Sequence, residues 1–133
     1  MKWKEEFQHG IIWQDFQHKQ LVGNINALIS SVTTGNIDEK TFRKTARFVV
    51  EYCNTHFKIE EAYMKSHGYP RTNAHVAQHN EFIKELNMLL HEDSADYSEK
   101  SSVLLNNLLK LFAEHILTTD KYFAQFLIKH KLV

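Results

Sequence analysis

The sequence predicts an all-α fold, an antiparallel up-down-up-down four-helix bundle with an irregular N-terminal arm and a short C-terminal helical segment. Four stretches of the chain carry apolar residues at the helical period. The connections between them are short, which forces neighbouring helices to run antiparallel. Only 4 Gly and 1 Pro occur in 133 residues, as expected when most of the chain is helical.

The first 34 residues predict the arm and the first helix. Residues 1–13 hold apolar anchors without a helical period, so we expect an ordered, irregular arm across the outside of the domain. Asp15 is a suitable N-cap for a first helix over about residues 15–34. The apolar stripe of this helix is His18, Leu21, Val22, Ile25, Leu28, Ile29 and Val32.

Three further helices come next at similar spacing. Asp38 begins the second, which runs to about Ser66 before Gly68 and Pro70, the usual order of stop signals. Thr72 or Asn73 caps the third, which runs to about Leu90, and Ser98 begins the fourth. Residues 118–120 predict a break before the apolar C-terminal segment. The interior stripes are Phe42, Ala46, Val49, Cys53, His56 or Phe57, Glu60 and Met64; then His75, His79, Phe82, Leu86 and Leu89; then Leu104, Leu108, Leu111 and His115.

Composition excludes several classes of protein. The length suits a single domain over residues 1–133. The 16 basic and 16 acidic residues balance, so the basic footprint of a nucleic-acid-binding protein is missing. No apolar run is long enough for a membrane span, and the N-terminus does not resemble a signal peptide. The single Cys53 favours a reducing compartment, and we expect a cytoplasmic protein.

The unusual feature of the composition is 9 His, and five of them fall on interior stripes. His56 with Glu60, and His75 with His79, are spaced i,i+4, which places both members of each pair on one helix face. His18 and the third-helix pair lie near helix starts, whereas His56 and His115 lie near helix ends. In an antiparallel bundle these positions share one level, so the five histidines and Glu60 are predicted to converge.

A single interior His is usually a satisfied core residue, but five from four helices at one depth favour a metal site. Imidazole and carboxylate without thiolate suit iron, manganese or zinc, and their number exceeds what one tetrahedral zinc uses. The set therefore predicts a two-metal site. His9, His67, His91 and His130 do not share this geometry, and we expect them to be exposed or in loops.

These residues resemble the hemerythrins, and most closely the stand-alone bacteriohemerythrins, over nearly the whole chain. The matching pieces are Gly10-Ile11, Asp15 to Leu21, His56 to Glu61, Met64, Tyr69-Pro70, His75 to His79, Phe82 and His115 to Asp120. The combined pattern is highly specific, although each piece alone is weak.

The resemblance implies two non-heme iron ions with an oxo or hydroxo bridge. His75, His79 and His115 then hold one iron, His18 and His56 hold the other, and Glu60 and Asp120 bridge them. Counting ligands leaves one open position, on the second iron. Periodicity does not find Asp120, since five residues after His115 correspond to about 140° around an ideal helix. A local π-type turn or a helix break is needed for it to reach the metals, and an N-cap of the terminal segment is its alternative role.

The implied function is reversible binding of dioxygen, as hydroperoxide at the open iron position, for storage, delivery or buffering. Apolar side chains next to the ligands are the candidates to keep this pocket dry, or are ordinary core: Leu21, Phe57, Leu111, Phe112 and Ile116. We expect no enzymatic activity and a monomer or weak homo-oligomer. The alternatives are an oxygen, nitric-oxide or redox sensor that acts through a separate partner, and a peroxidase-like di-iron enzyme.

Overall fold

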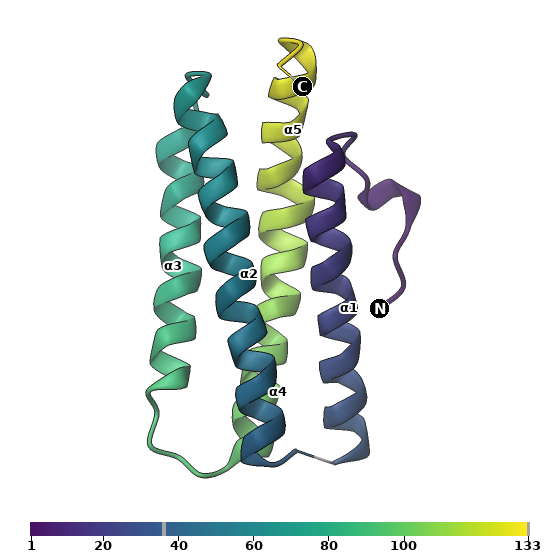
Figure 1. The fold of residues 1–133 in the computed structure, drawn as a ribbon, viewed down its shortest axis with the longest axis vertical. Helices are drawn as coiled ribbons and strands as arrows, with labels where there is room; N and C mark the ends of the chain where they lie inside the picture. The colour runs from purple at the N-terminus through teal and green to yellow at the C-terminus, as the bar shows by residue number, and fades with distance from the viewer. Residues whose placement is uncertain (36, 133) are drawn as a thin grey trace.

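The computed structural model describes residues 1–35 and 37–132, and it confirms the four-helix bundle (Figure 1). The elements in chain order are η1 (Glu5–Phe7), α1 (Ile12–Thr34), α2 (Glu39–Ser66), α3 (Thr72–Leu90), α4 (Tyr97–Lys110), η2 (Leu111–Asp120) and α5 (Lys121–Lys129). Each of α1 to α4 contacts the next, and α4 returns to α1, which closes the bundle. No strand occurs within these ranges.

The last three elements form one continuous helical rod along the bundle, and the predicted break at residues 118–120 is wrong (Figure 1). Leu111–Asp120 is a π-helix, with backbone hydrogen bonds from i to i+5, between two α-helical segments. Both flanking residues, Lys110 and Lys121, have right-handed helical backbone angles. The chain therefore changes its helical period here without interrupting the helix.

Three predicted helix starts need correction. The first helix begins at Ile12, so Asp15 lies within its first turn and is not its N-cap. The Asp15 carboxylate instead accepts the backbone N–H groups of His9 (2.7 Å) and Gly10 (3.1 Å) in the segment before the helix. The third begins at Thr72 without a side-chain cap. The fourth begins at Tyr97, because the Asp96 carboxylate accepts the Glu99 N–H at 3.0 Å. The predicted Asp38 cap is present, and it accepts from the Thr41 N–H.

The N-terminal arm packs on the bundle as expected, although its apolar anchors differ in burial. Phe7 meets Phe112 edge to face, with ring centroids 5.1 Å apart. Ile11 is 1% exposed, whereas Ile12 is 89% exposed because the helix turns it to solvent. Gly10 has a φ of +90°, which L residues rarely adopt, so the backbone favours glycine here, and a Cβ would also lie 3.3 Å from Ile128 Cδ1 of α5.

Two hydrophobic clusters fill the interior on either side of a polar layer. The larger cluster includes Ile25, Val49 and Leu104, and the smaller includes Met64 and Phe123. Between them lie buried histidines and carboxylates from four elements. Cys53 belongs to the larger cluster, and burial raises the pKa of its thiol to about 12.

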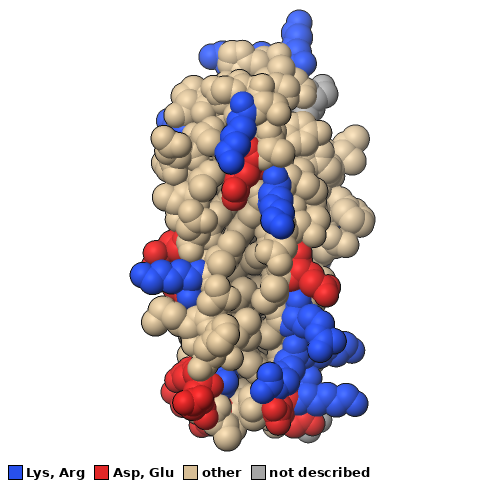
Figure 2. Space-filling model, turned by 60° about the vertical axis from the view of Figure 1, so that its left-hand side comes forward, with Lys and Arg blue, Asp and Glu red and all other residues tan. Residues whose placement is uncertain are grey.

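The surface carries charges of both signs. In the view of Figure 2, Lys and Arg side chains gather near the lower end together with Asp and Glu, and most of the remaining face is uncharged. A broad surface hollow at the start of α2 is lined by Asp38, Glu39, Lys40, Arg43, Lys44 and Arg47. Among the described helices, none combines the length and apolarity that crossing a bilayer requires.

Candidate metal centre

The structure brings all seven predicted ligands into one buried layer. They are His18, His56, Glu60, His75, His79, His115 and Asp120, and each is at most 4% exposed. Their donor atoms form two overlapping groups that could hold metal ions. Glu60, His75, His79, His115 and Asp120 make one group, and His18, His56 and Asp120 make the other, with all donor atoms of a group within 4.8 Å of one another.

The Asp120 carboxylate lies between the two groups, with one oxygen towards each. Its Oδ1 is 2.9 Å from Nε2 of both His75 and His115. Its Oδ2 is 3.0 Å from His18 Nε2 and 3.2 Å from His56 Nε2. No side-chain hydrogen bond caps α5 at this residue, so the alternative role as an N-cap is not realised.

The π-helix explains how Asp120 reaches this place. His115 and Asp120 are five residues apart on η2, and an i to i+5 hydrogen-bond pattern brings such residues onto one face. On an ideal α-helix the same pair would point about 140° apart. The local widening of the helix is thus the feature that places the carboxylate next to the His115 imidazole.

Glu60 meets both groups through a single oxygen. Its Oε1 lies 3.3 Å from Nε2 of His56 and His75, and 3.1 Å from His79 Nε2. Its Oε2 accepts a hydrogen bond from the Gln14 amide at 3.1 Å. The sequence interpretation did not include Gln14, which is 0% exposed and also donates to the Asp120 carbonyl at 3.3 Å.

The donor set fits a metal better than it fits a hydrogen-bond network. The Nε2 atoms of His79 and His115 are 3.1 Å apart, and the Nδ1 atom of each ring faces an acceptor oxygen, so two neutral rings turn their Nε2 lone pairs towards each other. His75 Nε2 and Asp120 Oδ1 are close, yet both remain buried without a hydrogen bond among the described residues. Nitrogen and carboxylate atoms that converge in this way are a ligand set for cations such as iron or zinc.

The ionisable side chains of the site compensate one another electrostatically. Burial alone would lower the pKa of His75, but the neighbouring carboxylates of Asp120 and Glu60 raise it to about 9. Burial and Asp120 would raise the pKa of Glu60, and the surrounding histidines bring it down to about 2. The pKa of Asp120 lies well below its usual range for the same reason, with His115 as the strongest favourable neighbour.

Three of the five histidines have an acceptor oxygen at Nδ1. Gln17 Oε1 lies 2.5 Å from His56 Nδ1, Glu61 Oε2 lies 2.9 Å from His79 Nδ1, and Gln78 Oε1 lies 2.8 Å from His115 Nδ1. Such contacts fix the ring orientation and leave Nε2 free to bind a metal. Sequence reasoning did not identify them, although each contact residue directly adjoins a ligand in the chain.

The remaining histidines are distributed as expected, with one qualification. His91 and His130 are exposed, and His67 is half-buried at the end of α2. His9 does lie in the segment before α1, but it is half-buried and its ring is 5.2 Å from that of His18. Burial lowers the pKa of His9, which favours the neutral ring.

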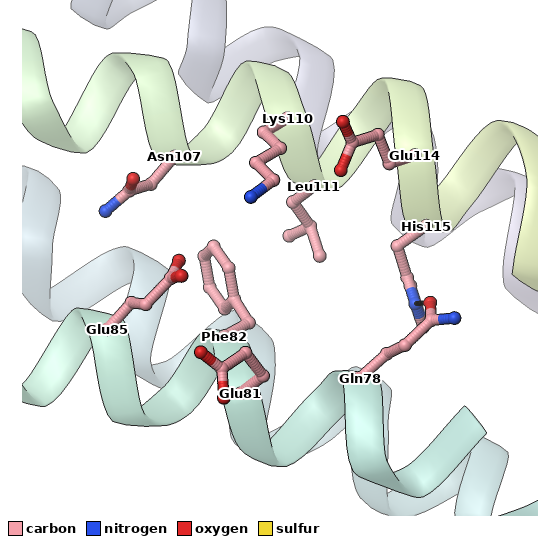
Figure 3. Close-up of a pocket in the computed structure, with 9 residues that line it drawn as sticks. All are labelled: Gln78, Glu81, Phe82, Glu85, Asn107, Lys110, Leu111, Glu114 and His115. Atoms are coloured by element: carbon pink, nitrogen blue, oxygen red, sulfur yellow. Dashed lines mark hydrogen bonds between the residues drawn. The ribbon is translucent and has the colours of Figure 1, made fainter. Parts of the chain in front are cut away.

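The five predicted pocket residues are all buried in the larger hydrophobic cluster: Leu21, Phe57, Leu111, Phe112 and Ile116. Phe57 stacks on the His79 ring, with centroids 3.9 Å apart and planes 6° apart. Leu111 also lines a cleft of about 320 Å³ between α3 and the α4–η2 rod (Figure 3). Phe82 and His115 lie at the same cleft, so it reaches the edge of the polar layer.

Comparison with known proteins decides the family. The model of the hemerythrin HHE cation binding domain matches residues 9–127. The chain belongs to the hemerythrin family. It is 28% identical over 122 residues to the bacteriohemerythrin of Methylococcus capsulatus, with 90% of this chain and 89% of the relative covered. It is 29% identical over 123 residues to that of Clostridium acetobutylicum, with 90% and 95% covered. A third bacteriohemerythrin, from Stenotrophomonas maltophilia, is 28% identical, with 92% and 78% covered.

Proposed function

We propose that this hemerythrin-family chain binds two non-heme iron ions, with an oxo or hydroxo bridge, and that the pair binds dioxygen reversibly. The observation that carries the proposal is the pair of overlapping ligand groups that share Asp120. A carboxylate that presents one oxygen to each group is suited to bridge two metals. The named relatives, all bacteriohemerythrins, support the same function.

The grouping of the donor atoms supports the assignment of each histidine to one of the two metals. His75, His79 and His115 lie together, and His18 and His56 lie on the other side of Asp120. With Glu60 as the second bridge, His75, His79 and His115 would hold one iron, and His18 and His56 would hold the other, whose smaller ligand set would leave a position for dioxygen. Glu60 already presents Oε1 to both sides, and a rotation that engages Oε2 would have to displace the Gln14 hydrogen bond.

When bound, the iron pair supplies two electrons and one open coordination position for dioxygen. The chain's own residues hold and protect the pair. Gln17, Glu61 and Gln78 fix three imidazole rings, so the ligands do not need to reorganise. Buried apolar side chains, among them Leu21 and Phe112, exclude water from the interior beside the ligands, which protects a reversible reaction from side reactions.

Tyr52 favours one alternative, a peroxidase-like di-iron enzyme. Its ring stacks on His56, with centroids 5.3 Å apart, and its hydroxyl is buried without a partner among the described residues. A buried phenol next to a metal ligand can supply an electron and a proton. Our proposal that the protein is not an enzyme therefore expects no catalytic consumption of peroxide by the iron-loaded protein, and consumption that Tyr52→Phe lowers would favour the peroxidase-like alternative.

The test is a visible spectrum of the reduced, iron-loaded protein under nitrogen, then in air, then under nitrogen again. A colourless form that gains colour in air and loses it again supports reversible dioxygen binding. Immediate conversion to a stable ferric spectrum contradicts it and favours a sensor or a peroxide-consuming enzyme. We also propose a cytoplasmic location, because a single buried thiol fits a reducing compartment, and a monomer or weak homo-oligomer.

A further inference from the structure

Two polar residues near the start of α1, His9 and Gln14, lie against the candidate metal centre, and the function proposed above gives His9 no role. Gln14 is 0% exposed on the first turn of α1. His9 precedes the helix, and Asp15 holds its backbone N–H at 2.7 Å. A fully buried amide needs specific partners, so its contacts define how this corner of the site is ordered.

The contacts of Gln14 fix the orientation of its amide group. Its Nε2 faces Glu60 Oε2 at 3.1 Å and the Asp120 carbonyl oxygen at 3.3 Å, and both of these atoms only accept. The Gln14 Oε1 is therefore an acceptor for the remaining neighbour, His9 Nδ1, at 3.1 Å. His9 must carry its proton on Nδ1, and in the neutral ring this leaves Nε2 as an acceptor.

The ring of His18 lies next to this acceptor. The two rings are 5.2 Å apart and nearly perpendicular, at 76°. When Nε2 of His18 binds a metal, its proton is on Nδ1, which must donate. Both His18 Nδ1 and His9 Nε2 are buried, and neither has a hydrogen-bond partner among the described residues. One is a donor and the other an acceptor, so their needs are complementary.

Three of the four other histidine ligands show what is missing at His18, whereas His75 Nδ1 is likewise buried without a partner among the described residues. His56, His79 and His115 each have a side-chain oxygen within 2.9 Å of Nδ1. His18 is held at Nε2 by Asp120 alone, and no oxygen plays the corresponding role at its Nδ1 in the described part of the chain. His9 and Asp15 are the groups near it, since one donor atom each of His9, Asp15 and His18 lie within 4.8 Å of one another. The two Asp15 carboxylate oxygens already accept the backbone N–H groups of His9 and Gly10, which leaves His9 Nε2 as the acceptor without a partner.

We propose that His9 is a positioning residue that accepts the Nδ1–H of metal-bound His18, directly or through one buried water. Gln14 then extends this contact to Glu60, so that a hydrogen-bonded chain joins a terminal ligand of one metal to a bridging carboxylate. The inference rests on the proposed two-metal site. Its consequence is a fixed His18 ring and a more basic Nε2, which strengthens metal binding at the two-histidine position.

The test is zinc binding by the metal-free protein, measured against a competing chromophoric chelator. His9→Leu removes the acceptor and should weaken the zinc affinity by about 10- to 100-fold. His9→Gln keeps an oxygen that can accept from His18 and an amide that can donate to Gln14, so it should restore most of the affinity. His91→Leu, at an exposed histidine away from the site, is the matched control.

A second readout separates positioning from packing. In zinc-loaded protein with isotope-labelled histidine, nuclear magnetic resonance should show a slowly exchanging Nδ1–H of His18 in the wild type and in His9→Gln, but not in His9→Leu. Gln14→Leu, which removes the amide that orients His9, should weaken zinc binding in the same direction and serves if His9→Leu does not fold.

Each result has a defined meaning. Equal zinc affinity in the wild type and His9→Leu overturns the role of His9 while leaving the two-metal site in place. Equal weakening in His9→Leu and His9→Gln also overturns it, because the acceptor would then not matter. A wild-type protein that binds neither zinc nor iron overturns the proposed function together with this inference.

Discussion

The predicted ligands on α3 and those on η2 reach the same buried layer by different helix geometries. His75 and His79 are four residues apart on a regular α-helix, and both Nε2 atoms lie within 3.3 Å of Glu60 Oε1. His115 and Asp120 are five residues apart on a π-helix, and the two side chains are 2.9 Å apart. A spacing that would separate a pair on α3 therefore brings a pair together on η2.

The difference shows that a ligand set depends on the local helical period as well as on the sequence spacing. On α3 the interior stripe continues through the site to Phe82 and Leu86, so packing and metal ligation use the same period. On η2 the wider turns move Asp120 from a lateral position to the interior. If this account is correct, changes to the π-helix should damage the site as severely as removing a ligand.

The largest expected effect comes from deleting Ala113, an exposed residue within η2. The deletion should convert the π-helix to a regular α-helix, on which His115 and Asp120, still five residues apart, would point about 140° apart. The two side chains could then no longer both reach the site, and both metals should be lost while circular dichroism still reports a helical protein. Deletion of Asp93, in the loop before α4, is the control. A deletion variant that keeps two metals would refute the role of the π-helix.

His79→Ala tests the α3 side of the comparison. It removes a ligand from the three-histidine group, so metal content should fall. Metal at a free concentration of about a hundred times its Kd stabilises the folded protein by about 2.7 kcal/mol. Loss of this binding should therefore lower the melting temperature by about 10 °C. His130→Ala, at an exposed histidine, should change neither quantity. Unchanged iron content in His79→Ala would remove this residue from the ligand set.

The free energy of unfolding of the metal-free protein should depend on pH in a range where that of the metal-loaded protein does not. The pKa of His75 rises from 6.5 to about 9 on folding, so its protonated form stabilises the fold fully below pH 6.5. That contribution, at most on the order of 3 kcal/mol, is lost as the pH rises through about 9. Urea unfolding of the metal-free wild type and His75→Gln measures the difference. A difference that stays constant from pH 6 to pH 10 would contradict the assignment.

The smallest expected effect concerns the contact between Gln78 on α3 and the π-helix η2. Gln78 on α3 accepts from His115 at Nδ1 (2.8 Å) and from the Thr119 hydroxyl (2.8 Å), so it holds η2 against α3. Gln78→Leu should weaken metal affinity by about 10- to 100-fold without abolishing binding. Asn80→Leu, at an exposed position of the same helix, is the matched control. Equal affinities for the two variants would show that this contact does not support the site.

Regular helical periodicity in the sequence was enough to predict the fold and the convergence of six of the seven candidate ligands in one layer. The four-helix bundle, the interior stripes and the common depth of the histidines all depend on the period of 3.6 residues and on antiparallel neighbours. Glu60 was found in the same way, because it lies one turn after His56. Asp120 came only from resemblance to the family, since its position depends on a change of period that the local sequence does not signal.

The residues around the ligands were the part that periodicity could not find. Gln17 and Gln78 lie beside the interior stripes, and their role depends on the direction of individual side chains across two helices. His9 looked like a loop residue because nothing in the chain before α1 indicates that the segment folds back onto His18. Asp15 would have been the clue, since its carboxylate binds the backbone of that segment.

The most direct test of the central claim is anaerobic titration of the metal-free protein with ferrous iron, followed by elemental analysis after desalting. Two overlapping ligand groups that share Asp120 predict two iron ions per chain. They also predict that Asp120→Ala lowers this number, because that carboxylate serves both groups. A wild-type protein that retains one iron or none, or an Asp120→Ala variant that still holds two, would contradict the account.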